Sequence, residues 1–99
     1  MRLTGARLNP NPFEGVEWVL YDIEMTSPKY SLGEVALITG DAGQLRGSVG
    51  LPDGVRVGRA GPRTVTIWIP AKRASGSYAV RVAMPDGGFA DIAINHTSR

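Results

Sequence analysis

The sequence predicts an all-β fold, namely a two-sheet sandwich of about seven short antiparallel strands behind an extended N-terminal arm. Apolar and polar residues alternate in several short runs, which is the period of a strand with one buried face. Gly and Pro, 13 and 7 of the 99 residues, are spread along the chain, as expected for many turns. No segment has a convincing helical spacing of apolar residues, so we expect one β domain over residues 16–99.

Composition narrows the class of protein further. Hydrophobic residues make up 42% of the chain, enough for the core of a single small domain. The chain has no Cys, which excludes disulfides and thiolate zinc sites. No run of about 18 apolar residues is present, and the first residues lack the apolar centre of a secretory signal. We therefore expect no membrane association.

Residues 1–15 are expected to form the arm. The Asn-Pro-Asn-Pro run at 9–12 disfavours a helix, because each proline lacks an N–H group and pushes the preceding residue towards extended geometry. Arg2, Arg7 and Phe13 would anchor this arm on neighbouring subunits.

The alternation predicts both the strands and their buried faces. The expected strands cover residues 16–25, 34–39, 44–49, 55–57, 64–69, 78–84 and 89–95. Turns are expected at 51–54 and 85–88, where proline and glycine fit turn geometry. The residues expected to face the core are Val19, Tyr21, Ile23, Met25, Val65, Ile67, Ile69, Tyr78, Val80, Val82 and Met84.

Two segments resemble bacterial and phage immunoglobulin-like, or fibronectin-type-III-like, domains. One is the segment 69–87, centred on Ser75-Gly76-Ser77-Tyr78-Ala79-Val80, and the other is the Tyr-x-x-x-Gly-Glu-x-Ala-Leu pattern of residues 30–37. The resemblance covers about half the chain and implies an immunoglobulin-like sandwich. It also implies that the hydroxyl of Tyr78 bonds back to the backbone at a sheet corner.

The sequence offers little catalytic chemistry. His96, the only histidine, is expected on the surface of the C-terminal tail. No nucleophile-elbow pattern and no phosphate-binding glycine loop is present. The carboxylate pairs Asp22/Glu24 and Asp86/Asp91 suggest calcium ligation, but turn chemistry and solvated faces explain them more simply. We expect no enzymatic activity, no cofactor and no catalytic or metal-binding residue.

Partner binding is the expected role. Trp68 shares a face with two threonines and should lie on the outer side of its sheet. There it could bind a partner protein, stack on a sugar, or be covered by another part of the same chain. Trp18 has the same ambiguity. The residues expected to bind partners are Arg2, Arg7, Phe13, Trp68 and Arg81. Basic and aromatic residues are not interleaved, so we expect no nucleic-acid binding.

Charge is distributed unevenly. Of the charged residues in 14–34, five are acidic and one is basic, whereas in 46–81 seven are basic and one is acidic. One copy could therefore attract another copy or an acidic surface. We expect a non-enzymatic structural protein of an oligomeric assembly. By fold-level analogy, this would be a phage virion accessory protein such as a capsid decoration or tail subunit. The alternative is a glycan- or surface-binding module of a secreted enzyme or adhesin, at the cell surface.

Overall fold

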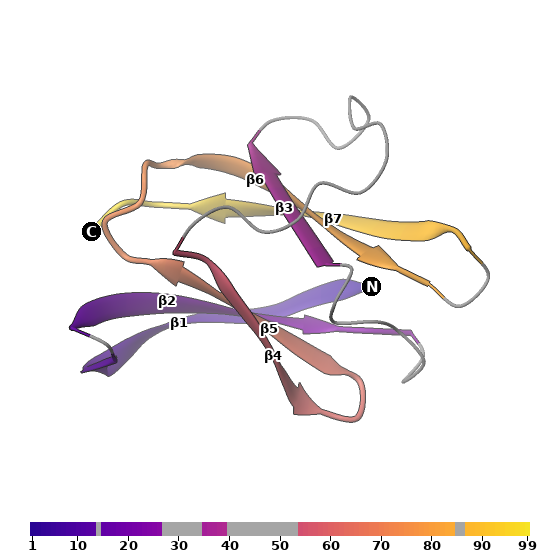
Figure 1. Ribbon diagram of the computed structural model, residues 1–99, viewed down its shortest axis with the longest axis horizontal. Coiled ribbons are helices and arrows are strands. Elements are labelled where there is room, and N and C mark those ends of the chain that lie inside the picture. Colours follow the sequence, from indigo (N-terminus) through magenta and orange to yellow (C-terminus); the bar gives the residue numbers. More distant parts are fainter. Residues whose placement is uncertain (14, 27–34, 40–53, 85–86) are drawn as a thin grey trace.

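The structure is a computed structural model that describes residues 1–13, 15–26, 35–39, 54–84 and 87–99, with the backbone alone described at 10–13 and 35–39. Two antiparallel sheets lie face to face (Figure 1). The four-stranded sheet has the order β1-β2-β5-β4 and the three-stranded sheet the order β3-β6-β7. The bounds are β1 (Arg2–Phe13), β2 (Val16–Glu24), β3 (Val35–Thr39), β4 (Arg56–Gly61), β5 (Thr64–Pro70), β6 (Gly76–Ala83) and β7 (Phe89–His96). The expected all-β, two-sheet architecture is confirmed.

The core forms because the alternating apolar sets of paired strands are in phase. In the four-stranded sheet Tyr21 lies opposite Ile67, and in the three-stranded sheet Tyr78 lies opposite Ile94. Side chains opposite each other project from the same face, so each sheet presents one continuous apolar surface to the other. Met84 is partly buried against this core. The other residues expected to face the core are all buried, and Val55, Ala71 and Ile94 join them.

The N-terminal segment differs from the expected arm. Arg2–Phe13 form β1, an edge strand that pairs antiparallel with β2 of the same chain, from Arg2 opposite Glu24 to Phe13 opposite Val16. The register shifts between Leu3 and Gly5. This shift changes the phase of the alternation. Leu3 and Leu8 are five residues apart, an odd number that would normally put them on opposite faces, yet they lie opposite Ile23 and Val19 on the same face. The strand period is therefore hidden in the sequence.

The other strands follow the prediction, with shifted ends. β4 extends to Gly61, well beyond the expected 55–57, and β6 begins two residues early at Gly76. The expected strand at 44–49 lies outside the described residues. Both expected turns contain a glycine with positive φ, Gly54 at 83° and Gly87 at 88°, a conformation that favours glycine.

The expectation for His96 is wrong. Its side chain is 2% exposed, because β7 continues as far as His96 and pairs it with Gly76. The alternation that turns Ile92 and Ile94 inward therefore also turns His96 inward. The tail beyond it is held against the β5–β6 connection, where the Arg99 N–H donates to the Ala71 carbonyl over 2.7 Å.

The hydrogen bond expected of Tyr78 is confirmed. Its hydroxyl donates to the Ala74 carbonyl over 2.7 Å. This bond ties the start of β6 to the end of the connection that precedes it.

Candidate interaction surface

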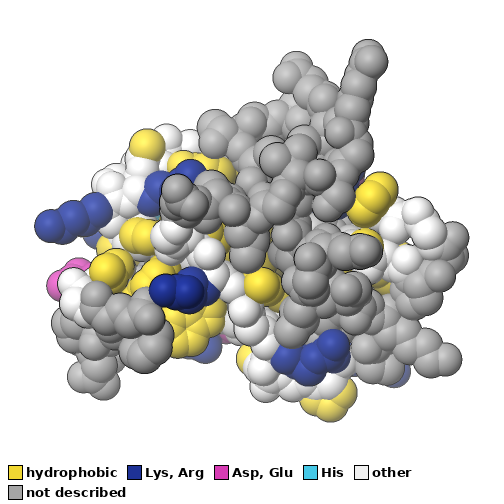
Figure 2. All heavy atoms as spheres, viewed as in Figure 1, with side chains coloured by type: hydrophobic (Ala, Val, Ile, Leu, Met, Phe, Trp, Pro, Cys, Tyr) yellow, Lys and Arg dark blue, Asp and Glu magenta, His cyan; other side chains and the backbone are white. Residues whose placement is uncertain are grey.

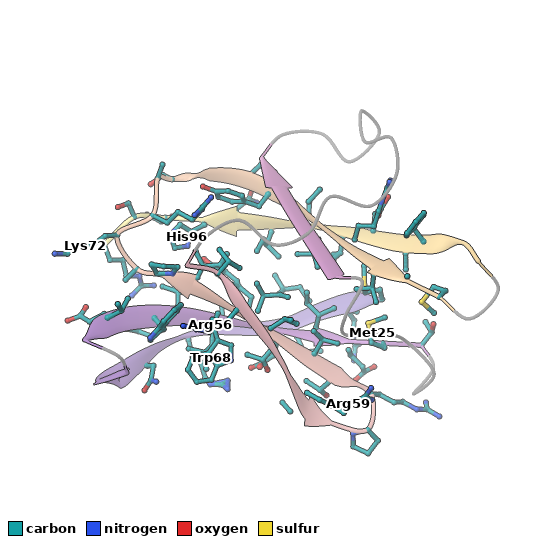
Figure 3. The ribbon with its side chains drawn as sticks, viewed as in Figure 1. Met25, Arg56, Arg59, Trp68, Lys72 and His96 are labelled. Carbon is teal, nitrogen blue, oxygen red and sulfur yellow. The ribbon has the colours of Figure 1, made fainter. Side chains whose placement is uncertain are left out.

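The outer face of the four-stranded sheet carries a row of side chains across all four strands. Pairing places Arg7 of β1 opposite Leu20 of β2, Leu20 opposite Trp68 of β5, and Trp68 opposite Arg56 of β4. These residues alternate with core residues, so they project away from the other sheet. Figure 3 shows Arg56 and Trp68 together on this outer side. We call this surface the Trp–Arg face and define it by Arg7, Trp18, Leu20, Arg56 and Trp68.

Apolar side chains on this face are more buried than an outer position suggests. Trp18 and Leu20 are only 2% and 6% exposed, whereas Trp68 is half-buried. The indole rings of Trp18 and Trp68 meet edge to face, with centroids 6.0 Å apart and an interplanar angle of 71°. Of the interpretations left open for the tryptophans, cover by the same chain therefore holds for Trp18. Trp68 keeps part of its surface available.

A carboxylate orders the middle of the Trp–Arg face. Asp22 accepts hydrogen bonds from Arg7 Nη1 at 2.6 Å and from Thr66 Oγ1 at 2.7 Å. Its side chain is 20% exposed, so this pair is less screened by water than a fully exposed one. Arg2 pairs with Glu24 at 3.3 Å, in contact with solvent. Strand pairing thus brings two basic residues of β1 against two acidic residues of β2.

A pocket of about 180 Å³ opens on the same side of the sheet. We call it the Gly58 pocket. Gly58 leaves it open, because a Cβ atom added there would meet no atom within 4 Å. Among the described residues that line it, two are arginines and none is acidic, and the carboxylate of Asp22 bonds to two of the lining residues, Arg7 and Thr66. The described lining residues are Arg7, Leu20, Gly58, Arg59, Ala60, Thr66 and Trp68.

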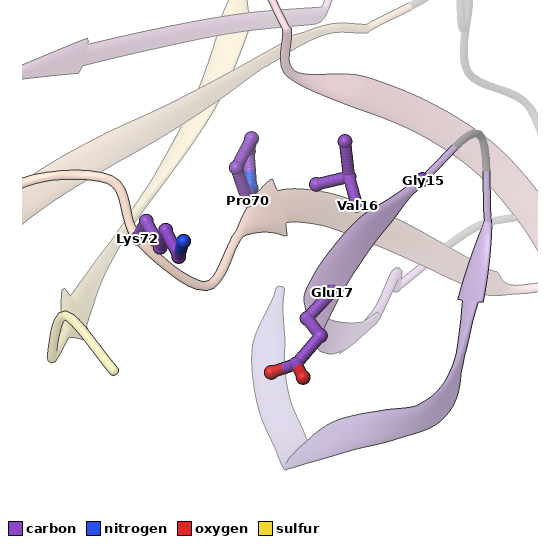
Figure 4. A pocket seen from close by; sticks show the side chains of 5 residues that line it. All are labelled: Gly15, Val16, Glu17, Pro70 and Lys72. Carbon is purple, nitrogen blue, oxygen red and sulfur yellow. The ribbon is translucent and has the colours of Figure 1, made fainter.

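A larger pocket, of about 300 Å³, lies where β2 begins and β5 ends (Figure 4). Its lining combines the acidic Glu17 and the basic Lys72 with Gly15, Val16 and Pro70. Glu17 and Lys72 carry opposite charges, so this lining favours neither sign of ligand.

The sites predicted from sequence are divided between the two sheets. Arg2, Arg7 and Trp68 belong to the four-stranded sheet, and only the backbone of Phe13, opposite Val16, is described. Arg81 lies on β6 of the other sheet, where it is paired with Asp91. Its Nε and Nη2 donate to the two carboxylate oxygens at 2.8 and 2.9 Å.

Arg81 also lies over the exposed ring of Phe89, 5.0 Å from the centroid. Sequence reasoning did not select Leu20, Arg56 or Gly58. The alternation places the first two on an outer face, but strand pairing decides which residues they meet.

The titratable groups offer no catalytic arrangement among the residues that the structure describes. Tyr21 and His96 share a hydrogen bond inside the core. Burial raises the pKa of Tyr21 and lowers that of His96. Of the carboxylates considered for calcium, Asp22, Glu24 and Asp91 each bond to an arginine. Asp86 is not described. The described residues contain no group of three or more acidic, His or Cys side chains that could hold a metal ion.

Figure 2 shows Lys and Arg side chains beside hydrophobic ones on the visible part of the lower, four-stranded sheet. Nowhere in the described part of the chain does a helix have the length and apolar character needed to cross a membrane. Comparison with family models, curated proteins and solved structures finds no match to this chain. The surface chemistry of the domain is therefore the guide to its role.

Proposed function

We propose that this chain is a non-enzymatic immunoglobulin-like interaction module that serves as a structural subunit of a macromolecular assembly. The strand order supports the immunoglobulin-like part of the proposal. Strands 1, 2, 5 and 4 form one sheet and strands 3, 6 and 7 the other, as strands A-B-E-D and C-F-G do in constant-type immunoglobulin domains. The bond from the Tyr78 hydroxyl to the Ala74 carbonyl supports it too, since such a tyrosine corner is typical of these sandwiches.

The observation that carries the interaction role is the row Arg7–Leu20–Trp68–Arg56. Tryptophan and arginine are the residues most enriched where protein interfaces have their largest energies. In this row a half-buried tryptophan stands between a buried leucine and an arginine. A partner that covers Trp68 would bury apolar area on a ring that is already held in place, because Trp18 packs against one side of it.

The setting we propose is a virion, where the chain would be a capsid decoration or tail accessory subunit. This part of the proposal rests on analogy between fold classes. Its rival is a glycan-binding module of a secreted or surface protein. A sugar platform needs an exposed, flat aromatic face. Trp18 is 2% exposed and meets Trp68 edge to face, which favours a protein partner over a sugar.

The interaction role can be tested by cross-linking in the native host. A photoreactive amino acid would replace Ala60, which is exposed and lines the Gly58 pocket. A matched variant would carry it at Ala93, which is exposed on the three-stranded sheet. We expect a discrete cross-linked protein from position 60 and none from position 93. No adduct at 60, or equal adducts at both, would overturn the proposed face.

Mass spectrometry of purified particles tests the virion setting separately. We expect the chain in stoichiometric amounts with the particle proteins. Its absence would reject the virion while leaving the interaction face in place. A glycan array that gives Trp68-dependent signals would replace the protein partner with a sugar.

A further inference from the structure

Residues 96–99 are fastened to the connection between β5 and β6, residues 71–75. We call residues 96–99 the C-terminal latch. The hydrogen bonds between the two segments run from the Arg99 N–H to the Ala71 carbonyl at 2.7 Å, from the Ser98 N–H to Ser75 Oγ at 2.7 Å and from Ser98 Oγ to the Lys72 carbonyl at 3.2 Å. Residues 97–99 are exposed. Water can therefore replace these bonds when the latch opens.

His96 is the buried end of the latch, at 2% exposure. Its ring lies between Tyr21 of β2, whose hydroxyl oxygen is 2.7 Å from Nδ1, and Tyr78 of β6, whose ring centroid is 6.3 Å away. Figure 3 shows His96 at the same end of the sandwich as Lys72 of the connection. His96 forms the last pair of the β6–β7 ladder, opposite Gly76. Because the end of a ladder opens at a lower free energy than its middle, His96 can leave the core while the sandwich stays folded.

The surroundings of His96 oppose a positive charge on its buried ring. Burial is the largest cause that lowers the pKa of His96, and the positive charges of Arg73 and Arg99 act in the same direction. The side chains that face the ring from β2 and β6 are neutral phenols. Two backbone carbonyl groups of the connection favour the charged form, but no carboxylate is among the described groups that act on the ring. A protonated His96 would thus share a buried site with two guanidinium groups.

Opening of the latch would remove this cost. In water an imidazole has its ordinary pKa of about 6.5, whereas the pKa of buried His96 is lower. The open form therefore binds a proton more readily than the closed form. Its population rises as the pH falls through about 6.5 towards the pKa of the closed form. The hydrogen bonds of the latch do not titrate in this range, so their strength sets the pH at which the latch opens.

We propose that the C-terminal latch is a pH-sensitive switch, closed at neutral pH and opened by protonation of His96. Opening exposes the Tyr21 hydroxyl and the ring of Tyr78, residues that are each 4% exposed in the closed form. The Tyr78 hydroxyl keeps its bond to the Ala74 carbonyl, so the start of β6 stays in place. This inference goes beyond the proposed interaction role and uses no residue of the Trp–Arg face.

An NMR titration of the full chain from about pH 7.5 to 5 tests the switch. It follows the amide signals of Ser98 and Arg99, the imidazole carbons of His96 and the methyl signals of Ile67, which is 0% exposed in β5. We expect the two amides to move to the positions of an unfolded chain, with the same midpoint as the imidazole carbons. This midpoint should lie below about 6.5. The Ile67 methyl signals should stay in place, because the sandwich remains folded.

Variants separate the proton from the latch bonds. His96→Leu cannot bind a proton, so its tail amides should keep their closed positions at pH 5. Ser75→Ala removes the acceptor of the Ser98 N–H at an exposed position, so this variant should fold. Loss of one hydrogen bond should raise the open population about two- to tenfold and move the midpoint up by about 0.3 to 1 pH unit. Ser77→Ala, at an exposed position of β6, is the control and should leave the midpoint unchanged.

Three results would overturn the switch. Tail amides that keep their closed positions down to pH 5 would show that the latch does not open. Loss of the Ile67 methyl signals at the same midpoint would show that protonation unfolds the whole domain. An equal midpoint in Ser75→Ala and in the original chain would show that the latch bonds do not control the change. Cross-linking at position 60 tests the Trp–Arg face whatever the latch does, so either proposal can fail alone.

Discussion

The Tyr21 hydroxyl oxygen and His96 Nδ1 lie 2.7 Å apart inside the core, although 75 residues separate them in sequence. Tyr21 lies on β2 of the four-stranded sheet and His96 ends β7 of the three-stranded sheet, so their hydrogen bond joins the two sheets. The ring of Tyr78 meets His96 edge to face, with centroids 6.3 Å apart. A polar cluster thus lies at the end of the sandwich where β7 finishes.

Removing the Tyr21 hydroxyl should destabilise the domain. Tyr21→Phe keeps the ring but leaves His96 Nδ1 buried without its partner. Leaving a buried polar group unsatisfied costs about 1–3 kcal/mol. Urea unfolding of Tyr21→Phe should show a loss of this size. In the His96→Leu background, Tyr21→Phe should cost much less than it does in the original chain, because the partner of the hydroxyl is already gone. Equal costs in the two backgrounds would contradict the role of this bond.

Stability should fall as the pH is lowered towards 5. Burial lowers the pKa of His96, and the positive charges of Arg73 and Arg99 act in the same direction, against the backbone carbonyl groups of Arg73 and Ala71. The unfolded chain therefore binds a proton more readily than the folded one, so stability is lost as pH falls through about 6.5, the ordinary His value, towards the folded pKa.

Thermal unfolding between pH 7.5 and 5.5 checks this pH dependence. His96 is the only histidine, so a His96→Leu variant should lose most of the dependence in this range. A slope unchanged in that variant would assign the titration to another group.

The two tryptophans should report different environments. Trp68→Phe leaves Trp18, at 2% exposure, as the only indole, because the chain has two tryptophans. We expect blue-shifted emission and weak quenching by acrylamide. Trp18→Phe leaves the half-buried Trp68 and should give redder, more quenchable emission. Strong quenching of Trp18 would contradict its burial on the Trp–Arg face.

Deleting residues 1–12 should destabilise the sandwich itself. The deletion removes nearly all of β1, exposes the hydrogen-bonding edge of β2 and takes away Met1, which packs against the core. We expect the cooperative unfolding transition to be lost or to shift to much lower denaturant. Arg2→Gln is the control, because loss of an exposed ion pair should change the free energy of unfolding by less than about 1 kcal/mol. A deletion variant as stable as the full chain would instead support the expectation that residues 1–15 form an arm that does not stabilise the sandwich.

The contrast between the central and edge strands shows what could be predicted from sequence. In β5, Val65, Ile67 and Ile69 alternate without interruption, and all three are 0% exposed. In β1 the register shift after Leu3 breaks the same alternation. The apolar residues of this segment therefore do not follow one two-residue period, and the segment is not recognised as a strand from its sequence. Its pairing with β2 depends on tertiary contacts and not on the local pattern.

The sequence by itself determined the all-β class, the buried face of each central strand and the glycine turns, because alternation and positive φ are local properties of the chain. Only the tertiary structure decided that β1 belongs to the sheet, that His96 is buried against Tyr21 and that Arg7, Leu20, Trp68 and Arg56 form one row. These relationships depend on the register between strands that are distant in sequence. A shift of one residue would send every side chain to the opposite face.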